Sequence, residues 1–388
     1  MKNKILFLLL SIFLCGCSYK EQVLEIDKGN SEFKQMGKAM DNVDNTLSCL
    51  IKEDIAYSFP FSKDVVRTEI FLNTELNKSV ILDVDMNTDV DDVCAVRMAT
   101  TLDDLGIIDL KAVCYCVDNS NISALRGLLH HDGKDDVLIG QGTEQRDDDS
   151  PYWDVLRQYD DNNEDLDTAV RQYRKVLSNS DRAVDIVVTG HLTNLEALLK
   201  SESDDISSLS GKELILSKVG QLYVVGGENP KGWSNNLALT TEDIIVTQYV
   251  SENWELPIVF SPSQTGGQLV CGKYLQDLDV DRLDPVTQCL YAFGTSTGRA
   301  AWDPFGVWIC GYACGHVNQV NLTKVDFSIS DTGVNKFISN DDGKDYLVTL
   351  SNNDLNYYNQ IMDNHLIYMF TKNYGIENPN KEEIGIHK

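Results

Sequence analysis

Short apolar runs alternate with helical stretches through the middle of the chain. An apolar run at 80–82 predicts a buried strand, and Val93, Ala95 and Val96 predict the start of a buried helix. The alternation continues in the order helix 94–105, strand 110–117, helix 122–131, strand 137–139, helix 167–177, strand 184–188 and strand 222–225. This order predicts an α/β fold with a mostly parallel central sheet and helices on both faces.

The N-terminal 17 residues have the pattern of an export signal. Lys2 and Lys4 precede an apolar run at 5–14 that is too short to span a bilayer. The junction Leu14-Cys15-Gly16-Cys17 resembles a bacterial lipobox, which predicts lipidation at Cys17. We therefore expect export and a lipid anchor in the bacterial cell envelope, at the outer membrane; an ordinary signal cleaved elsewhere is the alternative.

The rest of the chain divides into three segments by composition. Residues 18–77 are polar with mixed charge and predict a tether, residues 78–372 hold the predicted domain, and residues 373–388 form a tail. With 388 residues, 42% of them apolar, the chain is long enough to bury a large core. Its formal charge of −27 argues against nucleic-acid partners and against electrostatic docking on anionic lipid. No C-x-x-C motif pairs with a second one, so a structural zinc site is not expected.

An acidic turn between the first strand and the first helix is the main candidate for chemistry. Five aspartates fall within ten residues, namely Asp83, Asp85, Asp89, Asp91 and Asp92. Like charges at a buried turn repel one another and lose solvation, so a neutralising hard divalent cation is expected. The turn lies beyond the carboxyl end of a parallel strand, which is where ligands bind in such sheets.

Several interpretations compete for this turn. An EF-hand loop starting at Asp83 would have Thr88 where the turn needs glycine and Cys94 where it needs a bidentate glutamate. A haloacid-dehalogenase-type phosphatase also opens with a strand and D-x-D, but it needs Thr or Val where Asn87 stands. A merely solvated acidic loop conflicts with the apolar flanks.

The turn resembles the opening motif of the inosine-uridine-preferring nucleoside hydrolases, D-x-D-P-G-x-D-D. This chain has two extra residues and Met86-Asn87 in place of Pro-Gly, as in a variant subgroup of that family. Two later segments extend the resemblance, which covers residues 78–370. Thr189-Gly190-His191-Leu192-Thr193-Asn194 is similar to the family's T-G-P-L-T-N segment, and Trp302-Asp303-Pro304 is similar to its H-D-P or W-D segment.

The resemblance implies a nucleoside hydrolase-like, Rossmann-like fold and a set of site residues. Calcium would be held by Asp85, Asp92, the Thr189 carbonyl and Asp303. The implied substrate-binding residues are Asp91, which would bind a ribose hydroxyl, Asn119, Asn235, Asn236, Trp302 and Asp303. Asn119 fits an ordinary loop turn as well, and Asp303 fits a helix N-cap before Pro304.

The implied activity is calcium-dependent hydrolysis of the N-glycosidic bond of ribonucleosides or related ribosides. Calcium would orient the attacking water and Asp85 would take its proton as general base, giving free base and ribose for salvage. The expected partner is a small nucleoside or riboside, and members of the family often form homo-oligomers. The alternative is a catalytically silent, calcium-dependent nucleoside- or sugar-binding lipoprotein. Trp302 in place of a histidine, and the missing glutamate of a Glu-x-Asn motif at Asn236, favour that alternative.

Overall fold

The computed structural model describes residues 77–87, 89–118, 122–145, 150–160, 166–312, 319–351 and 353–377. The predicted export signal with Cys17, the tether up to residue 76, Asn119 and residues 378–388 of the predicted tail lie outside this set. Among the described residues, no helix combines the length and apolar character needed to cross a membrane.

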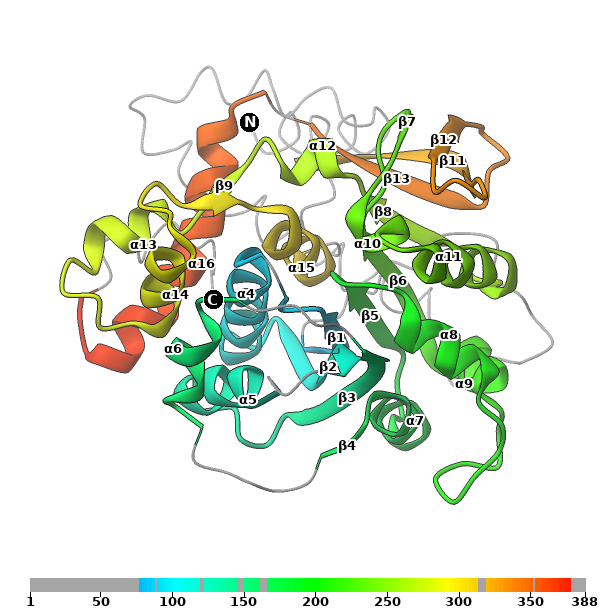
Figure 1. The fold of residues 1–388 in the computed structure, drawn as a ribbon, viewed down its shortest axis with the longest axis horizontal. Helices are drawn as coiled ribbons and strands as arrows, with labels where there is room; N and C mark the ends of the chain where they lie inside the picture. The colour runs from blue at the N-terminus through cyan, green and yellow to red at the C-terminus, as the bar shows by residue number, and fades with distance from the viewer. Residues whose placement is uncertain are drawn as a thin grey trace, which may run out of the picture. The chain divides into compact units, whose positions relative to one another are not determined.

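A central sheet organises the described part of the chain (Figure 1). Within that part it has eleven strands in the order β4-β3-β2-β1-β5-β6-β8-β13-β11-β12-β7. The strands are β1 Lys78–Val84, β2 Ile108–Asp118, β3 Leu138–Gln145, β4 Asp167–Thr168, β5 Val184–Val188, β6 Val219–Val225, β7 Lys231–Gly232, β8 Ile258–Ser261, β11 Val320–Ile329, β12 Asn335–Ser339 and β13 Asp345–Leu350. Neighbours from β4 to β13 run parallel, whereas β11, β12 and β7 continue the sheet antiparallel. The predicted mostly parallel sheet is confirmed.

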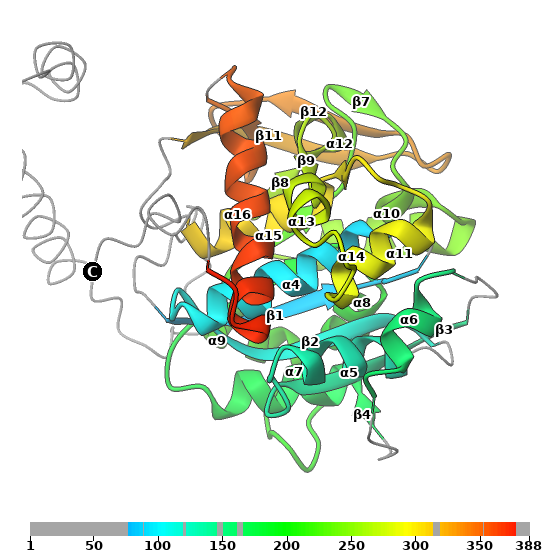
Figure 2. The ribbon, with the colours of Figure 1, turned by 90° about the vertical axis from the view of Figure 1, so that its left-hand side faces the viewer.

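Helices cover both faces of this sheet, as predicted. The helices of the described residues are α4 Asp91–Asp104, α5 Ile122–His131, α6 Trp153–Arg157, α7 Ala169–Asn179, α8 Thr193–Lys200, α9 Gly211–Lys218, α10 Asn235–Ala238, α11 Thr241–Asn253, α12 Ser263–Gly266, α13 Lys273–Leu278, α14 Pro285–Phe293, α15 Trp302–Tyr312 and α16 Leu355–Tyr374. Successive strand residues point to opposite faces, so Val80 and Leu82 enter one apolar cluster and Ile81 enters the other. The first cluster includes α4, α15 and α16, which pack together (Figure 2).

Some element boundaries differ from the prediction. The helix predicted at 94–105 begins at Asp91, so Asp91 and Asp92 lie in its first turn, where the helix dipole favours negative charge. The strand predicted at 137–139 runs on to Gln145 because it pairs with β2. Asp303 lies inside the first turn of α15, so the N-cap interpretation of that residue is wrong.

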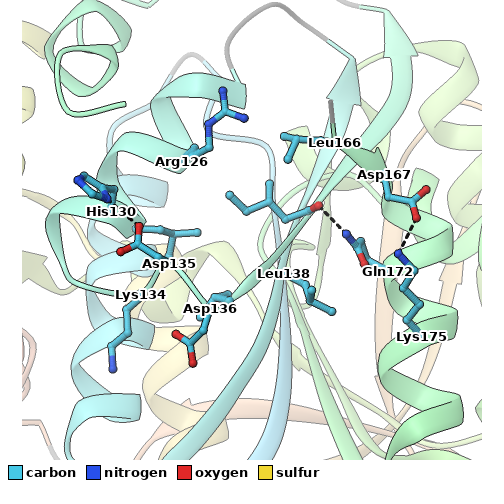
Figure 3. A pocket seen from close by; sticks show the side chains of 13 residues that line it. Arg126, His130, Lys134, Asp135, Asp136, Leu138, Leu166, Asp167, Gln172 and Lys175 are labelled. Carbon is cyan, nitrogen blue, oxygen red and sulfur yellow. Dashed lines mark hydrogen bonds and ion pairs between the residues drawn. The ribbon is translucent and has the colours of Figure 1, made fainter. Parts of the chain in front are cut away.

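A polar hollow of about 620 Å³ lies between α5 and α7, at the amino end of β3 (Figure 3). His130 pairs there with Asp135, and Lys175 with Asp167. The acidic turn follows the carboxyl end of β1, parallel to β2 and β3. The hollow therefore lies at the amino ends of these strands, whereas the acidic turn lies at their carboxyl ends.

Candidate metal centre at the strand ends

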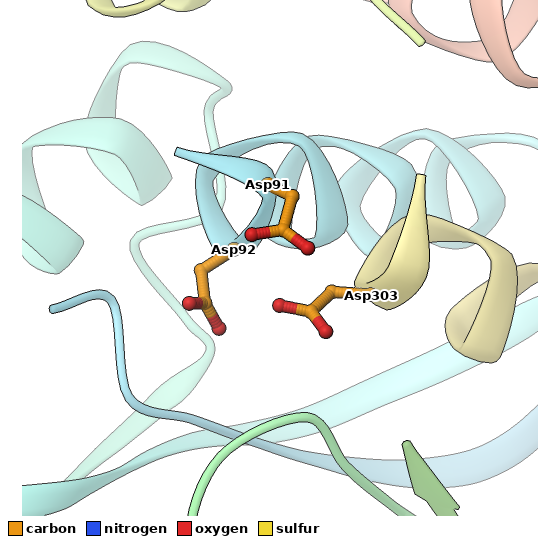
Figure 4. A group of neighbouring side chains, drawn as sticks. All are labelled: Asp91, Asp92 and Asp303. Atoms are coloured by element: carbon orange, nitrogen blue, oxygen red, sulfur yellow. The ribbon is translucent and has the colours of Figure 1, made fainter. Parts of the chain in front are cut away.

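Three buried carboxylates meet beyond the carboxyl ends of the parallel strands (Figure 4). Asp91 and Asp92 come from the first turn of α4, and Asp303 comes from the first turn of α15. One carboxylate oxygen of each lies within 4.8 Å of the others, and the three residues are 4%, 2% and 4% exposed. Two of the predicted metal ligands and a predicted sugar ligand thus form one group, which we call the aspartate trio.

The electrostatics of the aspartate trio call for a cation. Burial raises the pKa of all three carboxyl groups well above their usual range, and the charges of neighbouring aspartates raise it further. Within the described ranges, no lysine or arginine forms an ion pair with any of the three. The charge of Arg299 acts in the opposite sense on Asp91 alone. Clustered buried carboxylate oxygens are the donors that a hard divalent ion such as Ca²⁺ takes. The residues present therefore fit such an ion.

Asp85 lies beside the aspartate trio at the end of β1. Its carboxylate is in hydrogen-bonding contact with that of Asp92, and this contact helps to raise the pKa of Asp92 after the larger effect of burial. The Asp85 side chain is 17% exposed, more than any member of the trio. A Cβ atom on Gly190 would lie 2.8 Å from the Asp85 backbone nitrogen, so glycine is what allows β5 to end against Asp85.

Thr189 and Asn236 join the ends of β5 and β6 at the same place. The Thr189 hydroxyl donates to Asp92 Oδ1 at 3.0 Å, and its backbone N–H donates to the Asp83 carbonyl at 2.8 Å. Asn236 Nδ2 donates to the Thr189 carbonyl at 2.5 Å and to the Val225 carbonyl at 3.0 Å. A carbonyl oxygen has two lone pairs, so the Thr189 oxygen keeps capacity for a further partner.

Asp83 has a different environment from the other aspartates of the turn. It is fully buried, and its carboxylate accepts from the Tyr173 hydroxyl at 2.7 Å and from Asn194 Nδ2 at 3.0 Å. Burial raises its pKa to about 7 although both hydrogen bonds act in the opposite sense. Asp83 therefore ties β1 to α7 and α8. An EF-hand loop needs this residue as its first ligand, so the EF-hand interpretation does not fit.

Aromatic side chains that the sequence did not single out hold the main chain of the turn. The Tyr115 hydroxyl and the Trp153 indole N–H both donate to the Met86 carbonyl, at 3.2 and 2.8 Å. The Tyr152 hydroxyl donates to the Asn87 carbonyl at 3.0 Å. Met86 has a φ of 37°, an uncommon value for a residue with a side chain. These donors come from other elements, and no local motif marks them in the sequence.

His191 also contacts the site, through partners that were not predicted from the sequence. It is buried at 2% exposure, with Nε2 at 3.5 Å from Asp85 Oδ2 and Nδ1 at 3.6 Å from Asp243 Oδ1. Asp243 also belongs to the capping box of α11, through its bonds to Thr240. His191 thus stands between the end of β1 and the start of α11.

The remaining predicted substrate residues differ in their surroundings. The Trp302 indole N–H donates to the Ser263 carbonyl at 2.9 Å, so this donor is already engaged. Asn235, the first residue of α10, is exposed, whereas Asn236 is half-buried and bonded to main-chain carbonyls. Nothing in the described residues brings Asn235 to the aspartate trio.

The fold has counterparts among solved structures, although no family model and no curated protein match the chain. An inosine-uridine preferring nucleoside hydrolase from Bacillus anthracis matches with a TM-score of 0.54 at 14% identity, covering 76% of this chain and 99% of that chain. A purine-preferring ribonucleoside hydrolase from Gardnerella vaginalis matches at 0.56 and 16%, covering 77% and 100%. The type III effector protein XopQ, complexed with adenosine diphosphate ribose, matches at 0.53 and 13%, covering 71% and 88%. At these identities the likeness shows a shared architecture, and the chain therefore has a nucleoside hydrolase-like α/β fold.

Proposed function

We propose that this protein hydrolyses the N-glycosidic bond of ribonucleosides, or of related ribosides, in a calcium-dependent reaction that gives free base and ribose. The observation that carries the proposal is the convergence of Asp91, Asp92 and Asp303 in one buried group at the ligand-binding edge of the sheet. The likeness of the fold to nucleoside hydrolases supports the same reaction class.

The chain's own residues divide the proposed work among them. Asp85, Asp92, Asp303 and the Thr189 carbonyl would hold the ion, and Asp91 would accept a hydrogen bond from a ribose hydroxyl. Asp85 is the proposed general base because its carboxylate contacts that of Asp92 and, unlike the buried carboxylates of the trio, is partly exposed to water. When bound, calcium supplies positive charge that orients water and the sugar hydroxyls and lowers the pKa of that water.

The negative charge of the site suits the transition state of this reaction. Cleavage of a glycosidic bond develops positive charge on the sugar ring, and fixed carboxylates close to the ring stabilise it. The leaving base, by contrast, needs a proton or a donor. The engaged indole N–H of Trp302 is not such a donor, so a contribution of this residue to base departure would have to come from stacking of its ring.

This engagement of Trp302 favours a second candidate function, the capture of a nucleoside or sugar without turnover. A capture protein needs the ion and the grip on the ribose but no activation of the leaving base.

For either function we also propose that the protein is exported and anchored to the membrane by lipid at Cys17. Labelled fatty acid should enter the wild-type protein in cells and should not enter a Cys17→Ala variant.

The decisive experiment incubates purified protein with inosine, uridine or a chromogenic riboside and measures the release of reducing sugar. Release should require Ca²⁺, stop with EDTA and fall about a hundredfold or more in Asp85→Asn. Asp205→Asn changes an exposed carboxylate that pairs with Arg171, and as the matched control it should keep full activity. Calcium-dependent binding without sugar release would establish capture, and the absence of both would refute the two candidates.

A further inference from the structure

Arg299 makes the closest cationic contact to the acidic turn among the described residues. Its Nε donates to Asp89 Oδ1 at 2.9 Å and its Nη2 donates to Asp89 Oδ2 at 2.5 Å, so the two side chains form a two-point fork. The side chains are 33% and 30% exposed. A single surface ion pair contributes little to the free energy of folding. The fork matters here because it connects two distant segments of the chain.

Two aromatic rings fix the guanidinium in place. The Arg299 Cζ atom lies 5.2 Å from the centre of the Phe293 ring and 5.1 Å from the centre of the Trp302 ring. Trp302 is itself held by its bond to the Ser263 carbonyl and by close packing on Gly267, where a Cβ would lie 2.8 Å from the indole nitrogen. The guanidinium therefore contacts two rings, one of which is itself held by a hydrogen bond and by close packing.

The fork joins the two chain segments that carry the aspartate trio. Asp89 lies two residues before α4, which carries Asp91 and Asp92, and Arg299 lies on β10 (Arg299–Ala300), four residues before Asp303. The two segments are 210 residues apart in the chain. They also meet directly, because the Asp303 backbone N–H donates to the Asp91 carboxylate. The fork thus crosses the junction at which the three carboxylates must stay within 4.8 Å of one another.

We infer that Arg299 is a positioning residue, whose fork on Asp89 fastens the acidic turn to the segment before α15 and so keeps Asp91, Asp92 and Asp303 at cation-binding distance. The inference rests on the proposed cation site and adds to it a residue that does not itself touch the ion. The function of the fork is geometric. Groups that orient metal ligands from behind typically change metal affinity by about tenfold to a hundredfold when they are removed.

The charge of Arg299 and its fork have opposite effects on ion binding, which makes the inference testable. A permanent cation near a cation site repels the ion, so removing the charge of Arg299 should tighten binding if electrostatics were the whole effect. Lysine keeps the charge but cannot form the fork. Arg299→Lys therefore separates geometry from charge, and Arg299→Gln removes both.

The experiment measures the affinity for Tb³⁺ by luminescence, and for Ca²⁺ by calorimetry, with no nucleoside present. Arg299→Lys should bind both ions about tenfold to a hundredfold more weakly than wild type. Asp89→Asn breaks the same fork and also removes an acidic charge near the ion, so it should bind at least as weakly as Arg299→Lys. The double variant should be no weaker than the weaker single variant. Arg171→Lys breaks a similar fork, on Asp205 and outside the site, and should bind as wild type does.

Unchanged affinity in Arg299→Lys and Asp89→Asn, or tighter binding in Arg299→Gln, would overturn the inference. Metal-free thermal unfolding of each variant, compared with Arg171→Lys, shows whether it is folded. Failure of the proposed hydrolysis is a separate result: a wild-type protein that binds Tb³⁺ but releases no sugar refutes hydrolysis, while the ranking of the variants still decides the role of Arg299.

Discussion

The aspartates of one short turn are distinguished by partners that lie far away in the chain. Asp83 is bonded by Tyr173, Asp89 is neutralised by Arg299, and Asp92 joins a buried group with Asp303. The sequence predicted that this turn carries the chemistry, because apolar flanks placed its charges at the end of a strand. The resemblance assigned Asp85 and Asp92 to calcium and Asp91 to a ribose hydroxyl. It did not predict that Tyr173 would hold Asp83 or that Arg299 would pair with Asp89, since each of these partners belongs to another element and has no fixed spacing from the turn.

Gly190 provides a test of how tightly the site is packed. Alanine at this position would place Cβ 2.8 Å from the Asp85 nitrogen and 2.9 Å from Cys116 Sγ, so Asp85 must move. We expect Gly190→Ala to lose at least about tenfold in Ca²⁺ affinity and about 1–3 kcal/mol of stability, as overpacked positions do. Gly311→Ala meets a Leu102 methyl group at 2.7 Å, away from the site, and serves as the matched control. Equal Ca²⁺ affinity in calorimetry for both variants would contradict the expectation.

Helices and strands with a strong local period were predictable, and those that depend on distant pairing were not. The helix predicted at 122–131 and the strand predicted at 184–188 have those bounds in the structure. The antiparallel extension by β11, β12 and β7 was not predicted. β7 has only two residues and forms against β12, more than a hundred residues later, so its local sequence carries no periodicity that would reveal it.

The packing of α16 on α4 and α15 predicts a defined response to pH. His365 on α16 is buried, its Nδ1 faces the Ile361 carbonyl at 2.7 Å and its Nε2 faces the Tyr312 hydroxyl at 2.8 Å. Burial lowers its pKa from 6.5 to about 4. The unfolded chain therefore takes up a proton below about pH 6.5 while the folded chain does not, so its contribution is complete above pH 6.5 and is lost toward pH 4, up to about 3 kcal/mol.

Urea unfolding at several pH values between 4 and 7 tests this response. His365→Gln should be less stable than wild type at pH 7, because the helix contact is altered, but should lose less stability on acidification. His130→Gln changes a histidine whose side chain is 41% exposed and serves as the surface control. If wild type and His365→Gln lost the same stability between pH 7 and pH 4, His365 would not be the group that responds.

The arrangement of the whole sheet explains why the acidic groups can destabilise the fold and yet be needed for the proposed cation site. Parallel strands bring the carboxyl ends of β1 and β5 side by side, and α15 brings Asp303 there from a distant part of the chain. That convergence followed from the resemblance of separate motifs and not from any local periodicity. The convergence buries like-charged carboxylates, which is unfavourable for folding. A bound cation or protonation of the carboxylates lowers this unfavourable free energy.

Asp92→Asn should therefore change the free energy of unfolding in opposite directions with and without calcium. Without the ion, the substitution removes one like charge while the asparagine oxygen still accepts from the Thr189 hydroxyl, so stability should rise by about 1–2 kcal/mol. With Ca²⁺ at about a hundred times its dissociation constant, wild type should gain about 2.7 kcal/mol and the variant little. Thermal unfolding in EDTA and in Ca²⁺ measures both, with Asp205→Asn as the control. If the variant were less stable than wild type in EDTA, repulsion among the three carboxylates would not be destabilising the metal-free protein, and the expectation would be wrong.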